Sequence, residues 1–214
     1  MDENDYVKNK NNTKKISIKQ FSEVTKFHGH VCPGSAIGYK ASEAGLNELK
    51  SNESQDEELV AVVENDSCAV DAVQVLTGCT FGKGNLLFVD HGKQVYTFIN
   101  RTSEDAVRIS LKNSFSVDSL APKLGKLRAK VNSGIASELE KEDLKQMTVD
   151  VSNEILEIPY KNMFHIEHVD VDLPKKARIF KSVKCSKCGE FVSEHRCRVK
   201  NGQTVCMPCF EELK

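Results

Sequence analysis

The sequence predicts an α+β protein, in which a core of helices mixed with an antiparallel sheet precedes a small treble-clef-like zinc finger. Three observations predict this class. Segments with helical periodicity are interleaved with short apolar runs over the first 180 residues. Two Cys-x-x-Cys pairs stand near the end of the chain. A length of 214 residues suffices for one core of normal size and a small additional unit.

The composition divides the chain into three segments. Residues 1–15 are rich in Asn, Lys and acidic side chains with almost nothing to bury, and we expect a mobile tail there. Residues 16–180 are expected to form the α+β core domain. Residues 181–214 are expected to form a zinc finger with four cysteine ligands.

Local signals predict two helices at the start of the core. Ser17 and Gln20 have the spacing of a capping box, which predicts a helix that continues to His28. Pro33 suits the first turn of a second helix. Cys32 would then stand at or near the N-cap of this second helix.

A third helix and several strands are expected after it. The helix starts at about Cys68, behind the capping residues Asp66 and Ser67, and ends at Gly78. Residues 103–158 carry further helical patterns. The predicted strands are a buried one at 59–63, a hairpin of 86–90 and 94–99 about His91-Gly92, and one at 169–173.

Small residues form a strip along the second helix. They are Gly34, Gly38, Ser42 and Gly45. Such a strip permits the close approach of another backbone. It is interpreted either as packing within the chain or as the seam of a homodimer.

Charge and hydropathy exclude several classes of partner. The formal net charge is −1, which gives no bulk electrostatic reason to bind nucleic acid or an acidic membrane surface. No run of 18 apolar residues and no apolar leader is present, so we expect a cytoplasmic protein without a membrane span. In a reducing compartment, closely spaced cysteines bind metal or act in catalysis more often than they form disulfides.

The C-terminal cysteines have the spacing of a zinc site. Cys185, Cys188, Cys206 and Cys209 would complete a tetrahedral ion, so this zinc would be structural, without an open position. The segment has few apolar residues, and zinc binding would supply its folding free energy. Cys197 is a fifth thiol, interpreted as a structural cysteine or, alternatively, as a replacement ligand.

The finger also carries a hairpin signal and a small excess of positive charge. Asn201-Gly202 predicts a tight turn between two short strands. Residues 181–214 contain seven Lys or Arg and four Asp or Glu. Because aromatic residues are not interleaved with these charges, we expect the finger to contact protein rather than nucleic acid.

A second set of potential ligands lies in the core. It comprises His28, His30, Cys32, Cys68 and Cys79. Spacing by two residues sends side chains of an extended segment to one side, and imidazole with thiolate suits zinc, nickel, copper or iron. Alternatively, either histidine is a core residue, and Cys79 is a small apolar residue beyond a helix end.

Three residues of the core are candidates for catalysis. Cys32 and Cys68 stand at expected helix N-termini, where the dipole lowers the pKa of a thiol, so either is a candidate nucleophile. Asp71 follows Cys68 on the same helical face, as a proton acceptor, an orienting partner for an imidazole, or a simple first-turn acid. Lys83, between two glycines, is a candidate for binding a phosphate or carboxylate of a cofactor or substrate, although it lacks the spacing of a P-loop.

Two runs carry a family resemblance. Residues 27–34 (FHGHVCPG) and 64–85 (ENDSCAVDAVQVLTGCTFGKGN) closely resemble the FmdE family, which is named for the E subunit of formylmethanofuran dehydrogenase. The resemblance covers about residues 20–110, extends through 175, and includes the zinc finger that some members append to an α+β core. It implies a metal-associated site at the five core ligand candidates, with Asp71 as a neighbour.

The resemblance also implies a homodimer and a link to one-carbon metabolism. The family name reflects association with the molybdenum or tungsten enzyme that fixes carbon dioxide onto methanofuran in methane-forming archaea. Two classes of function follow from it. The chain is either an enzyme that uses an open metal ion or a reactive thiol, or an accessory protein that carries a metal or cofactor and docks on a larger enzyme through its finger.

Overall fold

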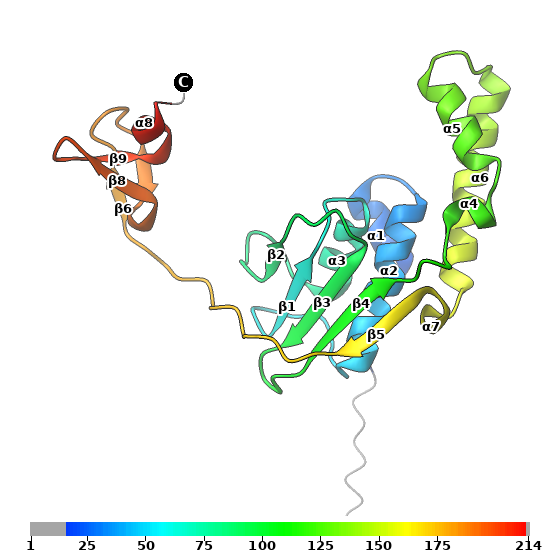
Figure 1. Ribbon diagram of the computed structural model, residues 1–214, viewed down its shortest axis with the longest axis horizontal. Helices are drawn as coiled ribbons and strands as arrows, with labels where there is room; N and C mark the ends of the chain where they lie inside the picture. Colours follow the sequence, from blue (N-terminus) through cyan, green and yellow to red (C-terminus); the bar gives the residue numbers. More distant parts are fainter. Residues whose placement is uncertain (1–15, 213–214) are drawn as a thin grey trace, which may run out of the picture. The chain divides into compact units, whose positions relative to one another are not determined.

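The computed structural model describes residues 16–212 of the chain (Figure 1). The expected mobile tail, residues 1–15, lies outside the described residues. The chain divides between Lys176 and Ala177 into a core unit and a C-terminal finger unit, each of which is compact. The predicted class is confirmed, because the core unit mixes helices with a largely antiparallel sheet and the finger unit carries a cysteine cluster.

The core unit contains a five-stranded sheet. Its order is β2 (Leu86–Phe88), β1 (Leu59–Val63), β3 (Val95–Asn100), β4 (Ala106–Leu111) and β5 (Phe164–His168). β1 is parallel to β2, and the other neighbouring strands are antiparallel. Alternate residues of each strand face a layer of helices, as the period of two along a strand requires. Phe98 and Ile109 are fully buried there.

The expected hairpin of 86–90 with 94–99 is wrong. β1 lies between β2 and β3 and pairs with both, so the two segments are never neighbours. The chain does reverse its direction between β2 and β3, and Gly92 there has a positive φ of 64°, but residues 89–93 form no regular turn. A local turn signal therefore marks a reversal of the chain without showing which strand becomes the neighbour.

Two further strand assignments need correction. Residues 106–111 form β4, although the sequence pattern predicts helices throughout 103–158. The last strand of the core is β5 at Phe164–His168, and 169–173 has no regular structure. Phe164 and Ile166 pack against the main core, while Val169 contacts a smaller cluster formed around Val60 and Ile99.

Three helices, α1 (Phe21–His28), α2 (Pro33–Glu48) and α3 (Ala69–Thr77), lie on one face of the sheet (Figure 1). The start of α2 and both ends of α3 match the expectation. The capping box at Ser17 is wrong, because α1 starts at Phe21 and its N-cap residue, Gln20, makes no side-chain cap bond. The Ser17 amide instead donates to the Asn52 side chain across 3.0 Å.

The small-residue strip packs within the chain. A Cβ on Gly38 would lie 2.2 Å from the Ala69 carbonyl oxygen, and one on Gly45 would lie 2.2 Å from the Phe98 ring. α2 therefore touches α3 and the sheet at distances that only glycine permits. Because this packing accounts for the strip, it gives no support to a dimer seam.

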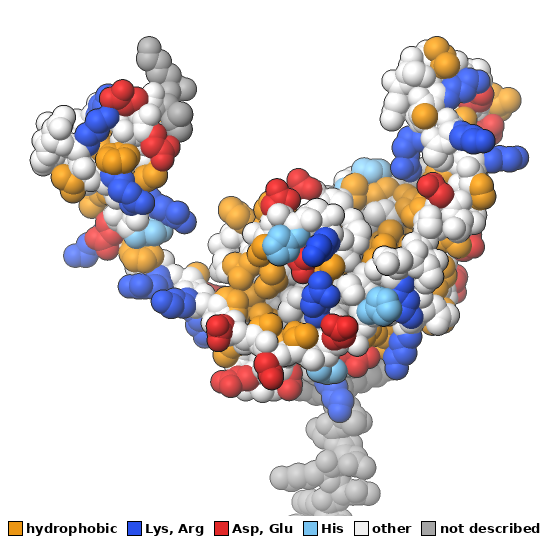
Figure 2. All heavy atoms as spheres, viewed as in Figure 1, with side chains coloured by type: hydrophobic (Ala, Val, Ile, Leu, Met, Phe, Trp, Pro, Cys, Tyr) orange, Lys and Arg blue, Asp and Glu red, His pale blue; other side chains and the backbone are white. Residues whose placement is uncertain are grey.

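A helical hairpin stands beside α2. It is built from α4 (Val117–Leu120), α5 (Leu124–Asn132) and α6 (Glu138–Glu157), and α7 (Tyr160–Met163) leads back to β5. Ser137 and Glu140 close a capping box at the start of α6. α6 packs on both α2 and α5, and Val151 and Ile155 bury its inner face. Lys and Arg side chains gather on the visible surface of this hairpin (Figure 2).

The finger unit has two small hairpins and a terminal helix. The elements are β6 (Ser182–Lys184), β7 (Phe191–Ser193), the 3-10 turn η1 (Glu194–Arg196), β8 (Cys197–Lys200), β9 (Gln203–Cys206) and α8 (Met207–Glu211). The predicted turn at Asn201-Gly202 joins β8 to β9, with φ of 53° and 74°. Within residues 16–212, no helix has the length and apolar character that crossing a membrane requires.

Candidate metal centres

The finger brings its four predicted ligands together. Cys185 and Cys188 lie on the turn after β6, and Cys206 and Cys209 lie at the start of α8. One sulfur from each lies within 4.8 Å of the others. Cys197 is outside this group, and its thiol faces the Ser193 carbonyl at 3.8 Å.

The four crowded thiols differ in pKa. Backbone N–H groups of Cys188 and Cys206 lower the pKa of Cys185 to about 6. Hydrogen bonding to Cys206, followed by burial and the other neighbouring thiols, raises the pKa of Cys209 to about 12. Four thiolates at this spacing repel one another, so a divalent cation is the natural partner of the fully deprotonated set.

The core site is built where α1 ends and α2 begins. His28 is the last residue of α1, and Gly29 follows in the left-handed conformation with φ of 89°. The reversal at Gly29 brings His30 back beside His28, with ring centroids 4.4 Å apart. Cys32 is the N-cap of α2, as expected, and its sulfur accepts a bond from the Ser35 amide at 3.3 Å.

Three potential ligands converge at this position. His28, His30 and Cys32 each offer one ligand atom, and the three atoms lie within 4.8 Å of one another. The Cys32 sulfur is 3.6 Å from His28 Nε2. The other ring nitrogen, His28 Nδ1, is 2.7 Å from Asp71 Oδ2, so the carboxylate fixes the orientation of the ring.

The charges around the site favour a thiolate beside an imidazolium. Burial lowers the pKa of His28, but the bond to Asp71 and the contact with Cys32 outweigh it and leave the pKa above its usual value. Burial raises the pKa of Cys32, but bonds from Ser35 and contacts with Cys68 and His28 outweigh it and leave the pKa below its usual value.

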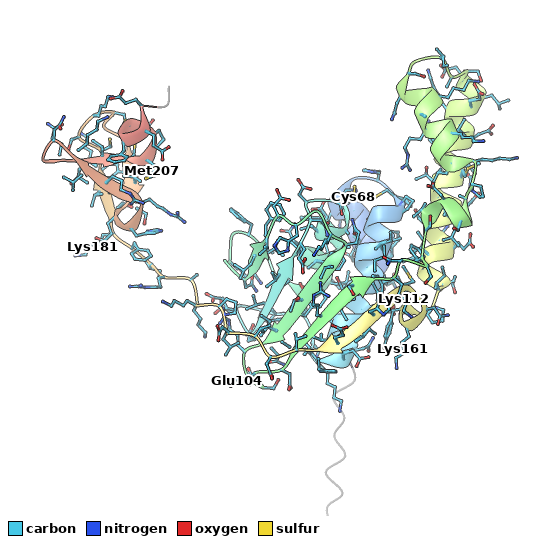
Figure 3. The ribbon with its side chains drawn as sticks, in the orientation of Figure 1. Cys68, Glu104, Lys112, Lys161, Lys181 and Met207 are labelled. Carbon is cyan, nitrogen blue, oxygen red and sulfur yellow. The ribbon has the colours of Figure 1, made fainter. Side chains whose placement is uncertain are left out.

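Cys68 lies at the edge of the cluster. Figure 3 labels it at the start of α3, close to the start of α2. Its thiol is in hydrogen-bond contact with Cys32, and burial together with the charge of Cys32 raises the pKa of Cys68. It is exposed and falls outside the tight group of three ligand atoms.

Two other predicted site residues lie elsewhere. Cys79 is fully buried in the core, where its thiol donates to the Leu59 carbonyl at 3.3 Å. Burial raises the pKa of Cys79 to about 11. The Lys83 ammonium donates to the Ser54 carbonyl at 3.1 Å, so it is engaged by a loop. The structure therefore does not bring Cys79 or Lys83 to the core cluster.

A cavity opens directly beside the core site. Its volume is about 590 Å³, and His30, Cys32 and Cys68 form one wall. The opposite wall comes from the helical hairpin, including Asp118 of α4 and Arg128 of α5. Sequence reasoning missed both residues, because they lie far along the chain from the ligands and stand in polar helices without a motif.

The donor set of the core fits a transition metal. In a tetrahedral zinc site, nitrogen and sulfur ligand atoms lie about 3.3–3.8 Å apart. The separation of 3.6 Å between Cys32 and His28 already falls in this range. Imidazole and thiolate are donors for zinc, nickel and iron, and the Asp71–His28 pair supplies the orienting carboxylate that such sites use.

The fold and the two clusters define a metal-binding α+β protein with a four-cysteine zinc finger. A model of the family described as "FmdE, Molybdenum formylmethanofuran dehydrogenase operon" matches residues 27–165. The chain belongs to this family, which confirms the resemblance of the two motif runs. The "Prokaryotic dksA/traR C4-type zinc finger" matches residues 178–214.

The chain is also similar to a curated protein and to a solved structure. It is 34% identical over 196 residues to a "Probable S-adenosyl-L-methionine-binding protein" of Archaeoglobus fulgidus; the match covers 86% of this chain and 50% of that protein. The chain thus spans about half the length of this curated relative. The crystal structure of a tungsten formylmethanofuran dehydrogenase FmdE-like protein from Syntrophus aciditrophicus has a similar fold, with a TM-score of 0.53 and 21% identity over 92% of this chain and 98% of that one.

Proposed function

We propose that the core unit binds one transition-metal ion through His28, His30 and Cys32, and that the ion acts on a small molecule in the adjoining cavity. The observation that carries this proposal is the convergence of three ligand atoms within 4.8 Å on the wall of a 590 Å³ cavity. Three protein ligands leave a fourth position for water, for Cys68 or for a substrate. The metal would act there as a Lewis acid.

Each protein group has a defined task in this proposal. Asp71 holds the Nδ1 proton of His28 and turns Nε2 toward the ion. The Ser35 amide stabilises Cys32 as a thiolate, and Cys68 would be available as a further ligand. The finger contributes structural zinc and a surface for a partner, without taking part in the chemistry.

The biological setting is also part of the proposal. Membership of a family named for formylmethanofuran dehydrogenase supports a place in one-carbon metabolism, including methanogenesis. The archaeal relative's name makes S-adenosyl-L-methionine a candidate ligand. The eight free cysteines suit a reducing cytoplasm. A homodimer and a molybdenum or tungsten enzyme as partner complete the proposal.

The same geometry supports a second candidate, in which Cys32 is a nucleophile. His28 Nε2 accepts the proton of the Cys32 thiol, and Asp71 stabilises the resulting imidazolium. In this case the site works without a metal. Metal content therefore decides between the two candidates.

The test compares the metal content of full-length variants. Cys32→Ala is expected to lose the core ion and to keep the zinc of the finger, giving one metal per chain instead of two. Cys79→Ala is the matched control, because this thiol is equally a cysteine of the core but lies away from the cluster. Equal metal content in wild type and Cys32→Ala would refute the metal site, and one metal per chain in both would favour the thiol candidate.

The rate at which the core metal ion exchanges distinguishes an accessory role from an enzymatic one. If the chain is a metal carrier, the core ion passes to a chelating acceptor within minutes and no candidate substrate is turned over. If the chain is an enzyme, the ion is retained over many turnovers. Isotopically labelled zinc, followed by mass spectrometry of the intact protein, measures the exchange at the core and at the finger together.

A further inference from the structure

The cavity beside the core site has a charged second wall. Asp118 Oδ1 lies 3.4 Å from the place that a Cβ on Gly125 would take, and Arg128 is one helical turn further along α5. Both side chains line the cavity and are exposed to it. In the part of the chain that the structure describes, neither forms an ion pair, so a carboxylate and a guanidinium are both available to a ligand.

The rest of the lining mixes the polar residues Ser67, Gln94 and Thr148 with an apolar patch. Ile37 and Leu124 are buried, and Leu144 is half-buried beside them. The part of a ligand that lies on this apolar patch should be hydrocarbon, because a polar group there would lose hydrogen bonds to water. The lining thus combines the soft-donor cluster, an apolar patch and the two opposite charges of Asp118 and Arg128.

Each part of this order recognises a different chemical group. A metal held by imidazole and thiolate accepts a sulfur donor in its open position. Arg128 suits a carboxylate, and Asp118 suits an ammonium group. We propose that the ligand of the cavity is a sulfur-containing α-amino acid, with its sulfur on the metal and its zwitterionic end on Asp118 and Arg128. This proposal rests on the metal site proposed above.

The test uses three thiols that differ by one group each. Homocysteine carries the thiol, the ammonium and the carboxylate. 4-Mercaptobutyrate lacks only the ammonium group, and 3-mercaptopropylamine lacks only the carboxylate. Full-length protein is loaded with Co²⁺, and the thiol-induced change in its visible spectrum is titrated. The finger does not contribute to this change, because four thiolates leave it no open position.

We expect homocysteine to bind about tenfold more tightly than either partial analogue, as the loss of a charge-assisted hydrogen bond requires. Arg128→Gln should lower the affinity for homocysteine to that for 3-mercaptopropylamine. Asp118→Asn should lower the affinity for homocysteine to that for 4-mercaptobutyrate. Lys126→Gln is the matched control, because it removes a positive charge from α5 but does not line the cavity, and it should change nothing.

The outcomes separate the two proposals. Equal affinities for all three thiols, or no effect of Arg128→Gln and Asp118→Asn while the spectrum still responds, would overturn the amino-acid ligand and leave the metal site standing. A thiol-induced spectrum that is unchanged in Cys32→Ala would overturn the metal site itself. Metal content measured after each titration excludes simple extraction of cobalt by the thiol.

Discussion

In the finger, the buried cluster consists of Cys185, Val205 and Cys206, so two of its three members are themselves metal ligands. In the core unit, His28, His30 and Cys32 sit on the rim of a large apolar core that they do not help to form. The difference teaches that the two clusters relate differently to the packing of their units. The finger cysteines are part of the packing that zinc stabilises, whereas the core folds around apolar residues and leaves its His and Cys cluster at the edge.

The comparison also explains the position of each cluster. The finger unit supplies four cysteines, two of them buried, and four thiolates complete a tetrahedral ion without an open position. The core ligands lie between the end of α1 and the start of α2, beside a cavity. A closed site suits structure and an open one suits chemistry.

The largest expected effect is the loss of the finger. Cys209→Ser should remove one zinc per chain and unfold the unit from about residue 177, because the binding free energy of structural zinc is about 10–16 kcal/mol and is also the folding free energy. Limited proteolysis should then cleave this region and leave the core intact. Cys197→Ser, a fifth cysteine outside the ligand group, is the control. Full zinc retention by Cys209→Ser would contradict the comparison.

A core variant should show the reverse pattern. Gly38→Ala places a methyl group 2.2 Å from the Ala69 carbonyl oxygen, so α2 and α3 must separate. We expect the free energy of unfolding of the core to fall by about 3 kcal/mol, while the zinc of the finger stays bound. Thermal denaturation combined with zinc analysis measures both. Gly82→Ala is the control, because nothing lies within 4 Å of its Cβ.

An intermediate effect is expected from the residue that orients His28. Asp71→Asn should weaken metal affinity of the core by about 10–100-fold, since it removes the carboxylate 2.7 Å from Nδ1. The finger should keep its zinc. Asp66→Asn makes the same charge change at an exposed position near the site and should leave affinity within about twofold of wild type. Competition with a metal-binding dye measures the two affinities, and equal losses in both variants would show a general charge effect.

The smallest effect concerns the reactivity of individual thiols. Among the three cysteines of the core, iodoacetamide should modify Cys32 first at pH 7 in protein without the core ion, because its pKa is lowered and a larger fraction is thiolate. The raised pKa of Cys68 makes it slower, with a rate that grows as pH rises. Cys79, with a pKa of about 11, should stay unmodified until the core unfolds. Peptide mass spectrometry over time gives the order, and early labelling of Cys79 would contradict its burial.

The sequence by itself determined the features that depend on residues close together in the chain. The two Cys-x-x-Cys pairs define the finger, and Asn201-Gly202 defines its hairpin. Pro33 and Gly78 mark ends of α2 and α3, because proline favours a first turn and glycine a left-handed C-cap. The group of His28, His30 and Cys32 was likewise predictable, although the left-handed Gly29 at the end of α1 brings it together rather than an extended segment.

Only the tertiary structure decided the features that depend on partners far away. Because β1 lies between β2 and β3, the expected hairpin does not form. β4 pairs with β5 at 164–168 rather than with the expected strand at 169–173. Cys79 was separated from Cys32 because the end of α3 is buried under β1, and Arg128 reached the site because α5 packs on α6, which packs on α2. The physical reason is that periodicity reports which face of an element is apolar, whereas the neighbour of that face is selected by packing of the whole chain.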